Sequence, residues 1–297
     1  MQILVGFVPI ALITITIVGN CLTFYVYSRK SFAKVSATFY LKTMAMLDSL
    51  NLIQVIGFSV PYAFGVDLKS FSSFSCKLLF FGAFFSHNMS SWCEALVALD
   101  RCLAIKFRAK LDTLNKLWFK LAATVGILLL NSPLYWPMLA YFRVLTPTES
   151  SNMSARFVGC YSSNGIYFKA YGWADLFATR LYRFATEKAR TQNDGPKSSV
   201  NRQQKVPKTS QRERRDFQFA LTSISLNALS LLLNLPIGVY LIYMVSFSSQ
   251  INSLLFMLSN IFLHLNLSYK FFLYLTVNTK FREEFFQTIS FIKIRNN

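Results

Sequence analysis

The sequence predicts an all-α membrane protein that crosses the bilayer six or seven times. Of its 297 residues, 53% are hydrophobic and only 15% are charged, whereas soluble chains carry about a quarter charged residues. The apolar residues form long uninterrupted runs, and a helix of about 18 or more such residues can cross a hydrocarbon core of ~30 Å. Short clusters of Lys and Arg separate these runs, as is typical of membrane-protein loops.

Six spans can be read directly from the apolar runs. The first run lacks a basic start and ends in Ser28-Arg29-Lys30, so we expect a transmembrane helix there and not a cleaved signal peptide. The six predicted spans cover residues 3–27, 37–64, 74–105, 117–142, 217–245 and 252–277.

The distribution of Lys and Arg predicts how the chain is oriented. Basic clusters follow the first and third spans, fill residues 188–215 and recur in the C-terminal tail, whereas the opposite loops are poorer in them. The positive-inside rule therefore places the N-terminus outside and the C-terminus in the cytoplasm. We interpret the net charge of +18 as attraction to anionic membrane lipid and not as a nucleic-acid surface. The basic loop at residues 191–212 is predicted to be disordered.

This orientation requires one more crossing, and the only segment available for it is residues 166–187. That segment carries Lys169, Asp175, Arg180, Arg183 and Glu187. A charge at the centre of a span costs ~2.5–3.5 kcal/mol, more than several apolar residues return. Either Asp175 faces the bundle and the arginines reach the headgroups, or part of this span is missing from the sequence. The fifth span is accordingly predicted to be atypical or truncated.

Two cysteines fall on the predicted outer side. Cys76 opens the third span and Cys160 lies in the second outer loop, where an oxidising compartment permits a disulfide. Two unrelated thiols are the alternative. Asn152-Met153-Ser154 in the same loop is a possible glycosylation sequon.

Asp100-Arg101 ends the third span at the predicted cytoplasmic face. An arginine there can pair with its neighbour or swing to another helix, which makes it a candidate switch. The alternative is a stop charge that reaches the headgroups. Arg101 lies twenty-five positions after Cys76.

Several further short motifs occur along the chain. They are Gly19-Asn20, Met46-Leu47-Asp48, Pro236, Phe272-Leu273-Tyr274, Asn278, Lys280-Phe281-Arg282 and Phe285. In this order and spacing the chain resembles the rhodopsin-like G-protein-coupled receptors over essentially its whole length. Residues 266–271, together with Trp92 and residues 103–105, are similar to the pattern of invertebrate FMRFamide-type neuropeptide receptors.

The resemblance implies a seven-helix receptor domain over residues 1–290, located in the plasma membrane. A short amphipathic cytoplasmic helix at residues 279–290 is expected from Phe281, Phe285 and Ile289, which recur every four positions. Residues 291–297 would form the tail. The roles implied by the resemblance are coupling for Asp100, Arg101 and Tyr274, a hinge for Pro236, helix eight for Phe281, Arg282 and Phe285, and a buried polar network for Asn20, Asp48, Ser90, Asn266 and Lys270.

The chain also departs from the family pattern. Cys102, Asn234 and Phe271 stand where the family has Tyr, Trp and Pro, and no proline marks the fifth span. The departure with the clearest physical content is at Lys270, where the family carries Asn. In the family, this Asn, Asp48 and Ser90 would contribute to a buried sodium site. Our hypothesis is that Lys270 neutralises Asp48 directly.

Two alternatives for Lys270 remain open from the sequence. Its side chain could extend to the headgroups, leaving Asp48 protonated or hydrated. It could also pair with Glu94, a second acid in the third span that has no assigned family counterpart.

The sequence therefore predicts a receptor that transmits an extracellular ligand, a peptide, to a heterotrimeric G protein. An apolar third span at residues 79–85 argues against a monoamine ligand. The alternatives are a chemosensory receptor for small molecules, a truncated form that does not signal, and a transporter or channel, which would show an internal repeat. No Walker loop, metal cluster or paired nucleophile and base occurs, so we expect neither an enzyme nor a cofactor.

Overall fold

The computed structural model describes residues 2–33, 35–54, 71–106, 116–144, 160–162, 211–247 and 253–295, and nearly all of them are helical. The α-helices are α1 (Gln2–Tyr27), α2 (Ala37–Gln54), α4 (Ser73–Lys106), α6 (Leu117–Tyr141), α9 (Gln211–Phe247), α10 (Ser253–Val277) and α11 (Thr279–Arg295). A 3-10 turn, η1 (Lys30–Phe32), follows α1, and two short strands are β1 (Phe142–Val144) and β2 (Cys160–Ser162). The prediction of an all-α architecture is thus confirmed in these residues, apart from the two strands.

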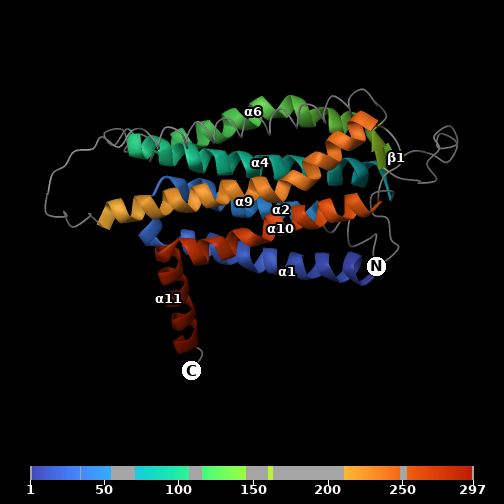
Figure 1. The fold of residues 1–297 in the computed structure, drawn as a ribbon. Coiled ribbons are helices and arrows are strands. Elements are labelled where there is room, and N and C mark those ends of the chain that lie inside the picture. Colours follow the sequence, from blue (N-terminus) through green and yellow to red (C-terminus); the bar gives the residue numbers. More distant parts are fainter. Residues whose placement is uncertain are drawn as a thin grey trace, which may run out of the picture.

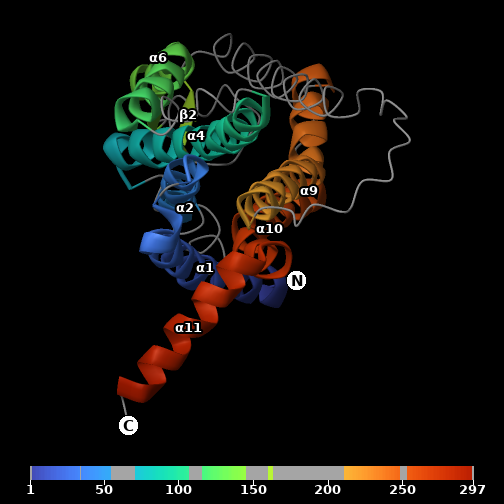
Figure 2. The same cartoon turned by 90° about the vertical axis from the view of Figure 1, so that its left-hand side faces the viewer.

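The helices α1, α2, α4, α6, α9 and α10 run side by side, and α11 turns away from them (Figure 1). In the view turned by 90°, α1 lies between α2 and α10, and α4 lies between α2 and α6 (Figure 2). The packing contacts agree, since α1 contacts α2 and α10, while α4 contacts α2, α6 and α9. The arrangement is a helix bundle with α11 attached at one end.

The helices follow the predicted apolar segments closely. Differences occur where polar sequence also favours a helix: α9 already begins at Gln211, in a run of Gln, Arg and Glu that are good helix formers. The last two residues of segment 191–212, expected to be disordered, are therefore helical. Likewise α11 continues to Arg295, beyond the predicted end at residue 290. The fifth span at 166–187, the rest of the basic loop and the Asn152 sequon lie outside the described residues.

Within the described part of the chain, three helices are long and apolar enough to cross a membrane. These stretches are Ile10–Tyr27, Leu117–Tyr141 and Gln218–Tyr240, and Ile261–Val277 is a shorter apolar helix among the described residues. The outward side of α6 exposes large apolar side chains, with Leu129, Leu130 and Trp136 between 62% and 80% exposed. A contiguous apolar face of this kind suits contact with lipid and not with water. The chain is accordingly a candidate membrane protein, and seven crossings stay a prediction.

The helices α2 and α4 are less apolar than these three and carry buried ionisable residues. Asp48 in α2, and Glu94, Asp100 and Arg101 in α4, are all buried within the bundle. Their charges lower the apolar character of each helix while facing other helices and not the surroundings. The same residues make up much of the candidate site below.

Two clusters of buried apolar side chains hold the bundle together. One centres on Tyr27, Phe32, Tyr274 and Phe281, where α1 and η1 meet α10 and α11. The other contains Cys76, Tyr135, Met138 and Phe142, where α4 meets α6 and β1. Strand β1 pairs antiparallel with β2, and Val144 lies opposite Cys160. The second cluster therefore lies beneath a small hairpin at the opposite end of the bundle from α11 (Figure 1).

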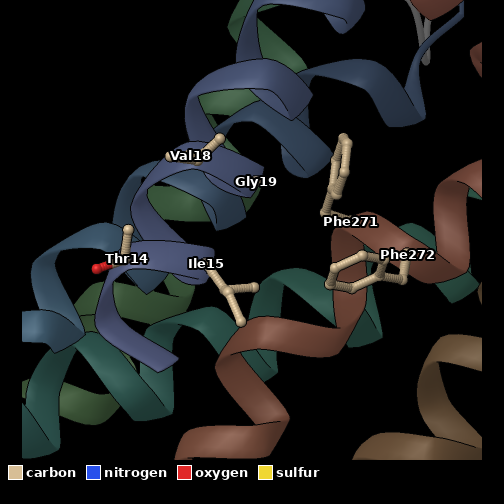
Figure 3. A pocket seen from close by; sticks show the side chains of 6 residues that line it. All are labelled: Thr14, Ile15, Val18, Gly19, Phe271 and Phe272. Atoms are coloured by element: carbon tan, nitrogen blue, oxygen red, sulfur yellow. The ribbon is translucent and has the colours of Figure 1, made fainter. Parts of the chain in front are cut away.

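Gly19 allows α1 to approach α10 closely. Phe271 of α10 lies beside it (Figure 3), and a Cβ added to Gly19 would come within 2.9 Å of the Cβ of Phe271. The Phe271 Cβ is fixed to its backbone, so the two helices would have to separate to relieve such a contact.

We expect Gly19→Ala to lower the free energy of unfolding by about 1–3 kcal/mol, the usual range for an overpacked interior. Thermal unfolding of the purified protein in detergent measures this change. The matched control is Gly126→Ala in α6, where an added Cβ meets nothing within 4 Å. Equal unfolding temperatures for the two variants would contradict the close approach.

Candidate functional site

A buried lysine lies between two buried carboxylates at the centre of the bundle. Lys270 Nζ of α10 is 2.9 Å from Asp48 Oδ2 of α2 and 2.8 Å from Glu94 Oε1 of α4. The amine also lies 3.2 Å from Ser90 Oγ, and Ser90 in turn donates to Asp48 Oδ1. These four side chains join three helices, and we call them the ionic junction.

The ionic junction is closed to solvent. The side chains of Asp48, Glu94 and Lys270 are 0%, 2% and 3% exposed, so the Lys270 amine does not reach the headgroup region. Of the arrangements that the sequence left open, the structure has Lys270 against both acids at once. Moving charges out of water costs several kcal/mol each, which only close pairing offsets. Each charge of the junction therefore stabilises the others, because it supplies the close pairing that offsets the cost of their burial.

The ionic junction continues into α9 through Ser230. The Ser230 hydroxyl donates to Glu94 Oε1 at 2.9 Å and lies 2.9 Å from the hydroxyl of Tyr269. It also lies 3.1 Å from Asn266 Oδ1, and Asn266 Nδ2 donates to Asn234 Oδ1 at 3.3 Å. Four helices thus converge on connected polar groups. Sequence reasoning missed Ser230 and Tyr269 because a single Ser or Tyr within an apolar run carries no distinguishing signal.

Asn20, which the resemblance placed in the same network, does not join it among the described residues. Asn20 is buried, but its Nδ2 has no hydrogen-bond partner within the described part of the chain. The polar link from α1 to α10 is instead Thr16, whose hydroxyl lies 2.7 Å from that of Ser268.

Arg101 lies near the C-terminal end of α4, close to the start of α2. Its Nε donates to Asp100 Oδ2 at 3.1 Å and its Nη2 donates to Ser36 Oγ at 2.8 Å. Ser36 in turn donates to Asp100 Oδ2 at 2.7 Å. The guanidinium carbon also lies 5.6 Å from the ring centre of Phe219 in α9, a favourable cation–π distance. Arg101 is therefore held by three groups, of which sequence reasoning identified only Asp100.

Tyr274, expected to act with Arg101, lies in an aromatic cluster at the α11 end of the bundle. It is fully buried, and its ring lies 5.5 Å from each of the rings of Tyr27 and Phe281. Within the described residues, no hydrogen bond joins Tyr274 to Arg101, and its hydroxyl has no partner. The contact between them is indirect: Phe219, over which Arg101 lies, packs on Phe32, and Phe32 packs on Tyr27, whose ring meets that of Tyr274.

The helix α11 is anchored to the bundle by its first two turns. Phe281 is buried, and the ring of Phe285 lies 5.5 Å from that of Phe271 in α10. Lys280 Nζ donates to the backbone oxygen of Ser31 at 3.2 Å. Arg282 is exposed on the outer side of the helix. The rest of α11 extends away from the bundle (Figure 2).

The hairpin end of the bundle is apolar and covalently closed. A disulfide joins Cys76 at the start of α4 to Cys160 of β2. Below it, the rings of Phe80 and Phe84 stack at 6.1 Å and those of Phe81 and Phe85 stack at 5.3 Å. Residues 79–86 of α4 contain no acidic residue.

Pro236, the expected hinge, lies inside α9, and the helix continues past it. Its carbonyl oxygen accepts a hydrogen bond from Ser259 Oγ of α10 at 3.3 Å. This contact ties the proline to the neighbouring helix.

Among the described residues, no group of three His, Cys, Asp or Glu side chains could hold a metal ion. The buried charges are shared between helices, so a movement of one helix affects the position of the others.

No known family matches the sequence, and no curated protein is significantly similar to it.

Proposed function

We propose that this chain is a seven-helix receptor that transmits the binding of an extracellular ligand, a short peptide, to a cytoplasmic heterotrimeric G protein. The observation that carries the proposal is the ionic junction, in which Lys270 holds α2, α4 and α10 together and Glu94 extends the link to α9. A bundle can span a membrane without buried charges, and such charges are costly. Buried charges inside a bundle therefore point to a function beyond spanning the membrane.

The ionic junction suits a two-state device. A shift of α10 would break the charge pairs of Lys270, and a shift of α9 would break the hydrogen bond from Ser230 to Glu94. Intermediate packings are therefore disfavoured, and the bundle has discrete states. A ligand that binds one packing better shifts the population toward it. A cytoplasmic partner that prefers the same packing then binds more tightly, and the coupling is reciprocal.

The two ends of the bundle suit different partners. At the hairpin end, the disulfide and the phenylalanine stacks of α4 form an apolar region without an acidic residue, which favours apolar peptide side chains over amines. At the other end, Arg101 is held by Asp100 and Ser36. We propose that this arrangement is the resting state and that release of Arg101 exposes it to the G protein.

The receptor reading is tested by expressing the full chain in cells that report calcium and cyclic nucleotides. We expect a response to members of a panel of short neuropeptides and none to a panel of volatile small molecules. A response to volatiles alone would favour a chemosensory receptor. If neither panel gives a response, and Ser36→Ala and Arg101→Ala both leave basal signalling unchanged, the proposal is wrong.

Ser36→Ala is expected to raise basal signalling. It removes a hydrogen bond to a charged group, which contributes about 1.5–3 kcal/mol, so the equilibrium should shift roughly 10- to 150-fold toward the released state. Arg101→Ala should abolish coupling while cell-surface expression stays normal. The matched control is Ser28→Ala, because Ser28 is exposed and its hydroxyl donates only to the carbonyl of Phe24. An equal rise in Ser28→Ala would count against the switch.

A further inference from the structure

An open groove lies where α1 meets α10, on the outer surface of the bundle. It is lined by Thr14, Ile15, Val18, Gly19, Phe271 and Phe272 and presents only apolar surface (Figure 3). Its volume of about 240 Å³ is many times the ~10–15 Å³ that a cavity needs to hold one water molecule. The groove is therefore better suited to part of an acyl chain than to single water molecules.

The groove lies within one of the stretches that can cross a membrane, Ile10–Tyr27. Counted at ~1.5 Å per residue, it lies roughly 12 to 20 Å from the Tyr27 end of α1. Half of the hydrocarbon core is ~15 Å thick. The groove is therefore at the depth reached by the distal part of an acyl chain whose headgroup lies at the Tyr27 end.

A track of exposed apolar side chains leads from the groove to that end of α1. Val18, Leu22 and Tyr25 follow one another at steps of four and three residues, which places them on one face of α1. Arg29 follows two residues after the helix ends at Tyr27. Val18 is 52% and Tyr25 49% exposed, and Leu22 is partly buried. The track ends in a cation.

The end of the track is basic. Arg29 is 37% exposed, and its ion pair from Nε to Glu284 Oε2 is 3.4 Å long, which is beyond the usual range for a hydrogen bond of this type. Exposed Lys30 follows it. Residues 28–31 and 279–284 together contain four basic and two acidic side chains. The excess positive charge complements an anionic headgroup.

We propose that α1, α10 and α11 form a binding site for one anionic phospholipid of the leaflet at the Arg29 end. Its phosphate lies against Arg29 and Lys30, and one acyl chain follows Tyr25 and Leu22 into the groove beside Gly19. The inference requires the chain to lie in a membrane but does not depend on the receptor function.

The test is native mass spectrometry of the full-length protein in detergent, titrated separately with phosphatidylserine, phosphatidylcholine and cholesterol. We expect one retained phosphatidylserine per chain and weaker retention of the other two. Arg29→Gln with Lys30→Gln should weaken phosphatidylserine binding by roughly fivefold for each charge removed. Val18→Trp, which fills the groove from an exposed position, should weaken phosphatidylserine binding by roughly fivefold, as much as the loss of one charge.

The controls place the same changes elsewhere on the bundle. Lys116→Gln removes an exposed cation before α6, and Leu129→Trp enlarges an exposed apolar residue of α6; neither should alter retention. Equal retention of phosphatidylserine and phosphatidylcholine, equal loss in the control variants, or cholesterol binding that depends on Val18 but not on Arg29 would each overturn the proposal. If Val18→Trp does not fold, Ile15→Trp tests the same groove.

Discussion

Lys270→Met should be among the most destabilising single substitutions in this chain, lowering the free energy of unfolding by about 3–5 kcal/mol. The substitution keeps the length and apolar stem of the side chain but takes the Lys270 charge away from Asp48 and Glu94, two acids that are 0% and 2% exposed. Thermal unfolding in detergent measures the loss. Lys116→Met, at an exposed lysine before α6, is the matched control and should change little.

Two further variants distinguish a charge effect from simple loss of packing. Lys270→Met combined with Asp48→Asn and Glu94→Gln removes all three charges, so it should recover most of the lost stability. Lys270→Asn leaves oxygen ligands that suit a hard cation, so its unfolding temperature should rise with sodium concentration while that of the native chain does not. If Lys270→Asn is as stable as the native chain at every sodium concentration, Lys270 does not neutralise the two acids.

Loss of the disulfide should have the next largest effect. Cys76→Ser with Cys160→Ser opens a loop whose ends are 84 residues apart, and removing such a bond typically costs about 2–5 kcal/mol. Unfolding is measured with and without a reducing agent, and reduced native protein should match the double variant. Cys21→Ser, at an exposed free cysteine, should unfold like the native chain. A native chain that is indifferent to the reducing agent would contradict the bond.

Helix positions were predictable from the sequence because the physical signal is local. A run such as 117–142 must be helical in lipid, since only intrahelical bonds satisfy its backbone, and the structure has α6 at Leu117–Tyr141. The start of α9 was not predictable in this way. Its first turns are polar, and there the helix-forming tendency of Gln, Arg and Glu outweighed the expectation of disorder.

The partners within the site were only partly predictable. Lys270 and Asp48 could be connected because a buried charge requires an opposite one. That Glu94 shares the same amine depends on how α4 is rotated against α10, which sequence spacing does not fix. The same limit explains Ser36 and Ser230, small polar residues whose importance comes only from the charged groups that they contact.

The ionic junction also has a consequence for how the chain is made. Asp48 and Lys270 are separated by 222 positions, so both acids leave the ribosome well before the lysine that neutralises them. Until α10 is synthesised, a nascent chain inserted in the membrane carries two carboxylates that lack the charge of Lys270. A chain that stops before Lys270 would therefore remain unassembled and be a ready target for quality control, whereas translation of α10 completes the charge pairing and locks the earlier helices together.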